Sequence, residues 1–270
     1  MIPAWSDDAI LHELFDADRR VGALPPDAEV IARPGWWQLR TPSFRRGGFN
    51  EVALSVLTDE EADAVIDETI DGYRRRGLRF RWRLGPGSAP ADLGERLAAR
   101  GLQRTITWAM ARGTDRLEDF RADAPAIRVE RVDAGNVDVF TEVNGRGWSM
   151  DPAPLRASNR RIVASGCPTG LFLATWEGAP AAASAVEFRD RSAFLIGGVV
   201  LPEFRGRGLY RALLRARLQA AADLGLTLAV THAIVETSGP ILSSLGFVTV
   251  LPFEVFLFDP EAEGLPSRSG

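Results

Sequence analysis

The sequence predicts a layered α/β (α+β) fold made of two similar domains. Segments in which apolar and polar residues alternate are interspersed with segments of helical spacing, as expected for strands and amphipathic helices. The order of these segments in the N-terminal half recurs in the C-terminal half, which is typical of a duplicated domain. The chain has 270 residues and is 46% hydrophobic, so it is long enough to bury the cores of two domains.

The N-terminal half shows the repeated pattern in its simpler form. Apolar residues alternate in the strand segments, and the first helix carries apolar residues at helical spacing. Thr58 precedes this helix and is a suitable N-terminal cap. The predicted elements are, in order, a strand at 50–57, a helix at 59–76, a strand at 78–84, a helix at 91–100 and a strand at 105–110.

The C-terminal half adds elements before the same pattern. We expect a strand at 127–132, a helix at 136–143, a hairpin of strands at 171–176 and 181–188, a strand at 192–200, a helix from about 208 to 223, a strand at 226–234, a helix ending at 245–247 and a closing strand pair at 248–258. The segment 144–152 contains the sequence Gly145-Arg146-Gly147. No strand directly precedes these glycines, which predicts a flexible loop rather than a second phosphate site.

The segment from Arg112 to Ala126 is polar and lacks long apolar periodicity, so it is the natural linker. The expected organisation is a first domain at 1–115, a linker at 116–126, a second domain at 127–260 and a tail at 261–270.

The most informative stretch runs from Val199 to Tyr210, where an apolar strand leads through a glycine-containing turn into a helix. Gly206 and Gly208 permit positive φ, so the N–H groups of the turn and of the helix start can converge on a phosphate. The spacing fits neither a P-loop nor a dinucleotide fingerprint. The candidate binding residues are Val199, Val200, Arg205, Gly206, Arg207, Gly208, Leu209 and Tyr210.

The corresponding place in the N-terminal half has Leu57-Thr58-Asp59-Glu60 instead. This sequence starts an ordinary capped helix and brings two carboxylates to where a phosphate would lie. We therefore expect the N-terminal half to bind no phosphate group there.

The stretch at Arg205–Tyr210 resembles the R-G-x-G-[LIY] pyrophosphate loop of the GNAT superfamily of acyl-CoA N-acyltransferases. A helix ending in Leu245-Gly246-Phe247 before the last strands resembles a second GNAT signature. The resemblance implies a tandem GNAT protein with a degenerate N-terminal domain and a competent C-terminal one. Each domain would have a mixed, mostly antiparallel sheet flanked by helices, and acetyl-CoA would be the donor substrate, without a metal.

The resemblance also implies direct attack of an amine on the thioester. Superfamily members often place a proton-donating Tyr four residues before the Gly of the second signature, where this chain has Leu242. The candidates for proton transfer are His232, Glu236 and Ser243, with Ser238, Ser244 and solvent as alternative donors to the thiolate. A histidine titrates near neutrality, but His232 in an apolar strand also fits a core residue. Trp148, beside Gly147, is the candidate contact to the substrate.

The composition of the chain excludes some classes of binding partner and location. The net charge of −4 argues against nucleic acid, and the single cysteine, Cys167, fits a reducing cytoplasm. No apolar run reaches about 18 residues and the first residues carry no basic region, so neither a membrane span nor a signal peptide is expected. We expect a monomer or a homodimer.

The predicted function is an N-acetyltransferase that moves an acetyl group from acetyl-CoA to a primary amine of a small molecule or peptide. The alternatives are a non-catalytic acyl-CoA-binding regulatory or partner protein, and a GNAT-like transferase with a longer acyl donor. A third reading is a transferase that takes aminoacyl groups from tRNA, which the acidic balance and the intact loop disfavour.

Overall fold

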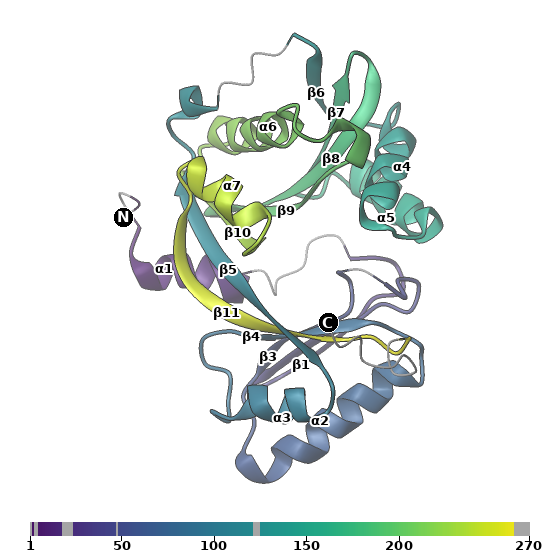
Figure 1. The fold of residues 1–270 in the computed structure, drawn as a ribbon, viewed down its shortest axis with the longest axis vertical. Coiled ribbons are helices and arrows are strands. Elements are labelled where there is room, and N and C mark those ends of the chain that lie inside the picture. The colour runs from purple at the N-terminus through teal and green to yellow at the C-terminus, as the bar shows by residue number, and fades with distance from the viewer. Residues whose placement is uncertain (1, 3–4, 18–23, 47, 121–124, 262–270) are drawn as a thin grey trace. The chain divides into compact units, whose positions relative to one another are not determined.

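The computed structural model describes residues 2, 5–17, 24–46, 48–120 and 125–261 (Figure 1). The chain forms two compact units, each assembled from two separate stretches. Unit 1 comprises Met1–Pro25 and Trp108–Pro252, and unit 2 comprises Pro26–Thr107 and Phe253–Gly270. These limits differ from the domain limits expected from the sequence. The difference arises because Met1–Pro25 belongs to unit 1 and because strands β5 (Gln103–Gly113) and β11 (Val248–Phe258) each cross from one unit into the other.

Unit 2 is a sheet covered by two helices. Its strand order is β1-β2-β3-β4-β11-β5, with β3 and β4 parallel and β4 and β11 antiparallel. Helix α2 buries Ile66, Ile70 and Tyr73 against the sheet, and the Tyr73 ring stacks on Phe80 at 4.1 Å between centroids. Besides parts of β5 and β11, unit 2 contains β1 (Glu29–Arg33), β2 (Trp36–Arg40), β3 (Glu51–Ser55), α2 (Asp59–Arg74), β4 (Phe80–Leu84) and α3 (Leu93–Ala99).

Unit 1 has the strand order β11-β5-β10-β9-β8-β7-β6, in which β9 and β10 are parallel and the strands from β9 to β6 are antiparallel neighbours. A short π-helical turn, His12–Asp16, follows α1. The remaining elements are α1 (Asp7–Leu11), β6 (Ile127–Arg131), α4 (Val137–Trp148), α5 (Pro152–Ser165), β7 (Thr169–Trp176), β8 (Ala179–Phe188), β9 (Ser192–Val200), α6 (Leu209–Asp223), β10 (Leu228–Ile234) and α7 (Ser238–Ser244).

Helices cover both faces of the unit 1 sheet. Phe140 and Val143 of α4 pack with Leu171 and Val199 on one face. Apolar residues of α6 and α7, with Phe172 of β7, form the core on the other face. Successive strand residues point to opposite faces, which is why Leu171 and Phe172 belong to different cores. Figure 1 shows α6 and the α4–α5 pair on opposite sides of these strands.

The two halves of the chain repeat one order of elements, as the sequence predicted. The series β1-β2-β3-α2-β4-α3-β5 matches β7-β8-β9-α6-β10-α7-β11. The final strands are exchanged, however. In unit 1 the neighbour of β10 is β5, from the N-terminal half, and in unit 2 the neighbour of β4 is β11, from the C-terminal half.

Three predicted segments differ from the structure. Residues 144–148, predicted as a flexible loop, form the last part of helix α4. A Cβ at Gly147 would overlap Val199, so this glycine lets α4 approach β9 closely. Helix α5 was not predicted, and the closing strand pair is the single strand β11.

We expect a fragment that starts at Arg121 to be insoluble or inactive. Arg121 itself lies outside the described residues. The cut removes Trp108–Gly113 of β5, the strand beside β10, and Met1–Pro25 of unit 1. It also deprives the Phe253–Phe258 part of β11 of its neighbour β4. Soluble yield and CoA binding, measured beside the full chain, test this. A soluble and fully active fragment would show that the first half is dispensable.

Candidate functional site

The turn between β9 and α6 has the geometry of an anion cradle. Gly206 has a φ of +75° and Gly208, the N-cap residue of α6, has a φ of +87°. The first α-helical bond in this turn runs from the Ala212 N–H to the Gly208 carbonyl, at 3.0 Å. The N–H groups of residues 209–211 therefore have no acceptor within the helix. Together with the positive end of the helix dipole, they fit a phosphate.

Two exposed arginines flank this cradle. The Arg207 guanidinium lies 4.9 Å from the centre of the Trp176 ring, and the Arg205 Nε donates to the Val200 carbonyl at 3.3 Å. Guanidinium groups in these positions suit phosphate binding. Val199 and Leu209 are buried, so only the backbone of these two predicted binding residues is available to a ligand.

A β-bulge lies on β9 just before the cradle. In the β8–β9 ladder Ser184 is opposite Gly198 and Ala185 is opposite Ile196, which leaves Gly197 as the extra residue. The parallel ladder with β10 joins 192–194 to 228–230 and ends there, although both strands continue. Beyond it, the Thr231 hydroxyl donates to the Leu195 carbonyl at 2.9 Å.

His232 and Trp148 lie on the face of the sheet that α4 covers. The neighbouring Ala233 packs in the core under α6 and α7, and strand alternation places His232 on the opposite face. The half-buried His232 ring lies 5.4 Å from the rings of both Phe15 and Phe194. The Trp148 ring is 44% exposed and its atoms lie 3.6–3.8 Å from the position of a Cβ on Gly197.

The other predicted residues lie apart from this group. Glu236 is exposed in the turn after β10, and Ser243 is exposed on α7. The Ser244 hydroxyl donates to the Ile241 carbonyl at 2.7 Å, and the Ser238 hydroxyl accepts the Ile234 N–H at 3.0 Å. Leu242 is 2% exposed and belongs to the core under α6.

Sequence reasoning named Tyr210 as part of the binding turn but missed Arg217. The Tyr210 ring lies against Gly198, and the buried Arg217 donates to two β-strand carbonyls at the bulge. One signal was available in the sequence. Arg217 stands seven residues after Tyr210 within the apolar stripe of α6, where an arginine needs buried acceptors.

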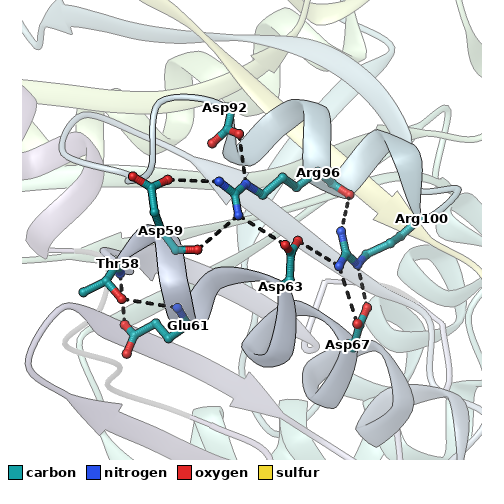
Figure 2. A network of polar contacts seen from close by, with 8 residues as sticks. All are labelled: Thr58, Asp59, Glu61, Asp63, Asp67, Asp92, Arg96 and Arg100. Carbon is teal, nitrogen blue, oxygen red and sulfur yellow. Dashed lines mark hydrogen bonds and ion pairs between the residues drawn. The ribbon is translucent and has the colours of Figure 1, made fainter.

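The equivalent helix start in unit 2 is already capped. The Thr58 hydroxyl accepts the Glu61 N–H at 3.3 Å, and the Glu61 side chain accepts the Thr58 N–H at 3.1 Å. Arg96 of α3 bonds both the side chain and the carbonyl of Asp59, at 2.9 and 3.2 Å (Figure 2). Arg100 extends this network to Asp63 and Asp67. The capped start was expected from the sequence, and the Asp59 and Glu61 carboxylates are engaged in these contacts.

Thr58→Ala is expected to destabilise unit 2 without changing CoA binding. It removes one half of the capping box, a loss worth about 1 kcal/mol of unfolding free energy. Chemical denaturation followed by tryptophan fluorescence measures the loss, because Trp36 and Trp82 are buried in unit 2. Weaker CoA binding by this variant would contradict a role confined to the cap.

Among the described residues, no group of three or more His, Cys, Asp or Glu side chains is placed to hold a metal ion. In the same part of the chain, no helix has the length and apolar character needed to cross a membrane.

The fold and the cradle together define an α/β protein in which a glycine turn with free N–H groups follows a bulged strand. Residues 138–247 match the acetyltransferase (GNAT) family, in agreement with the resemblance seen in the sequence. A comparison with curated proteins gives no match.

Solved structures share the whole fold. A GCN5-related N-acetyltransferase from Kribbella flavida has a TM-score of 0.63 at 15% identity, covering 93% of this chain and 96% of that one. A tandem GNAT protein from the clavulanic acid biosynthesis pathway has a TM-score of 0.56 at 15% identity, covering 97% of each chain. A functionally unknown conserved protein from Staphylococcus epidermidis has a TM-score of 0.65 at 12% identity, covering 86% and 94%. The chain therefore has the tandem GNAT fold.

Proposed function

We propose that this protein is an acyl-CoA-dependent N-acyltransferase that moves an acetyl group from acetyl-CoA to a primary amine of a small molecule or peptide. The observation that carries the proposal is the open cradle at Gly206–Gly208, which follows directly on the bulged strand of the GNAT domain. The cradle would hold the pyrophosphate, with Arg205 and Arg207 beside it. The bulge would then receive the pantetheine arm and the thioester, because the glycines leave room for a close approach.

In this proposal His232 takes the proton of the attacking ammonium, directly or through one water. It lies on the same face as Trp148, whose exposed ring would form part of the acceptor site. Glu236 is the next candidate base and Ser243 a candidate donor to the thiolate, although both are exposed and Ser243 lies on α7, which packs on the other face.

The test is a screen of primary amines with acetyl-CoA, in which thiol release is measured. Amine-dependent release supports transfer. Tight CoA binding without thiol release for any amine would instead support the non-catalytic acyl-CoA-binding protein. This alternative is favoured by Leu242, a buried leucine at the position of the usual proton-donating tyrosine. A series of longer acyl donors distinguishes chain length, and competition between tRNA and CoA would indicate the aminoacyl alternative.

We also propose a cytoplasmic location, on the basis of the lone Cys167.

A further inference from the structure

Tyr210 is placed differently from the other tyrosine of the chain. The Tyr73 hydroxyl donates to the Leu39 carbonyl at 2.7 Å inside unit 2. The Tyr210 ring lies in the first turn of α6, directly after the cradle, and a Cβ at Gly198 would be 2.8 Å from its Cε2 atom. Within the described part of the chain, no group hydrogen-bonds the Tyr210 hydroxyl, and its oxygen is not enclosed. The hydroxyl is therefore available to a ligand.

Arg217 supports this tyrosine and the bulge together. It is 2% exposed and donates to the carbonyls of Ala185 at 3.1 Å, Ile196 at 3.4 Å and Leu213 at 3.3 Å. Ala185 and Ile196 are the residues at which the ladder shifts register. A bulge disrupts the ladder locally, and the guanidinium supplies donors there. The Arg217 Nη2 atom lies 3.5 Å from the Cβ position of Gly198, so it shares this spot with the Tyr210 ring.

The charge of Arg217 beside the Tyr210 phenol favours donation of the phenol proton followed by reprotonation. Burial raises the pKa of Tyr210, and the positive charge of Arg217 opposes that rise. Burial lowers the pKa of Arg217 to about 10, so the guanidinium stays positively charged at neutral pH. A transient phenolate would have a fixed cation beside it.

We propose that Tyr210 donates the proton that the CoA thiolate takes up as it leaves, with Arg217 as the positioning residue that holds the bulge and steadies the phenolate. This rests on the proposed acyl transfer. The amine nitrogen bonds the carbonyl carbon, the C–S bond breaks with its electron pair going to sulfur, and the sulfur takes the Tyr210 proton. Before the attack the ammonium gives one proton to His232 or water. The nitrogen loses its second proton to water as the amide forms, and water reprotonates the phenolate.

The arrangement explains two features at once. His232 and Trp148 lie on the α4 face of the sheet, and Tyr210 lies on the α6 face. The amine therefore loses its proton on one side of the sheet, and the thiolate receives a proton from the other side. The arrangement also needs no proton donor at Leu242, which is a core residue on α7.

The test compares Tyr210→Phe with Tyr73→Phe, the matched control in unit 2. Tyr210→Phe keeps the ring on Gly198 and removes only the hydroxyl. We expect kcat to fall by about 10²-fold, as for loss of a general acid, while the CoA dissociation constant from calorimetry changes less than about twofold. Tyr73→Phe should retain the wild-type kcat.

An unchanged kcat in Tyr210→Phe would overturn the assignment and leave the transferase proposal intact. So would a loss explained by weaker CoA binding, or an equal loss in Tyr73→Phe. Wild-type protein that releases no thiol with any amine would overturn both the assignment and the proposed function.

Discussion

A variant that carries Gly206→Asp and Gly208→Asp is expected to lose CoA binding, whereas the wild-type chain binds one CoA. Both glycines have positive φ, so each aspartate strains the turn and brings a carboxylate to the cradle. Hydrogen bonds to a charged group contribute about 1.5–3 kcal/mol each. The loss of two or more of them weakens binding by more than about 100-fold. Isothermal titration calorimetry measures the affinity and the stoichiometry.

A double variant in unit 2 controls for backbone strain. Gly77 and Gly101 also have positive φ, and a Cβ at either would meet nothing within 4 Å. Gly77→Asp with Gly101→Asp should therefore bind CoA as the wild type does. A wild-type stoichiometry near two would contradict the assignment of CoA to the C-terminal cradle alone, as would unchanged binding in the Gly206 and Gly208 variant.

His232→Ala is expected to lower turnover by about 10²-fold or more, which is the usual cost of removing a general base. CoA affinity should change little, because His232 lies on β10 and not in the cradle. The part of the pH dependence of the rate that comes from the general base should also be lost. Steady-state kinetics across pH 5–9 measures both effects.

His12→Ala is the control, since the chain has only these 2 histidines. The His12 side chain is 41% exposed, and its Nδ1 atom lies 3.4 Å from an Asp16 carboxylate oxygen. Its loss should leave the pH profile intact. Survival of turnover and profile in His232→Ala would move the role of base to Glu236, or indicate that the amine arrives neutral.

The sequence predicted those parts of the fold that depend on local chemistry. The capped start of α2 at Thr58 and the turn at Gly206–Gly208 are set by neighbouring residues, and both lie where they were expected. Helix α5 was not predicted because its buried face has few apolar residues. It buries Leu155, Ser158 and Asn159, and the Asn159 amide donates to the Thr141 hydroxyl at 3.0 Å.

The missed parts depend on long-range pairing. The last strands of the two similar halves have equivalent patterns of apolar residues. No local feature of the sequence therefore indicates that β5 pairs beside β10 and β11 beside β4. The contacts of Arg217 were missed for the same reason, because its acceptors on β8 and β9 are 32 and 21 residues away in sequence.

The exchange of β5 and β11 also governs the order in which this chain can fold as it leaves the ribosome. Domains arranged one after another fold one after another, starting at the N-terminus. Here the segment Pro26–Thr107 has emerged long before Phe253–Phe258, the part of β11 that fills its sheet between β4 and β5. The first half must therefore wait with an open strand edge until Phe258 has been synthesised. An incomplete chain released before Phe258 would leave that edge unpaired, so truncated products should aggregate or be degraded rather than persist as a folded half.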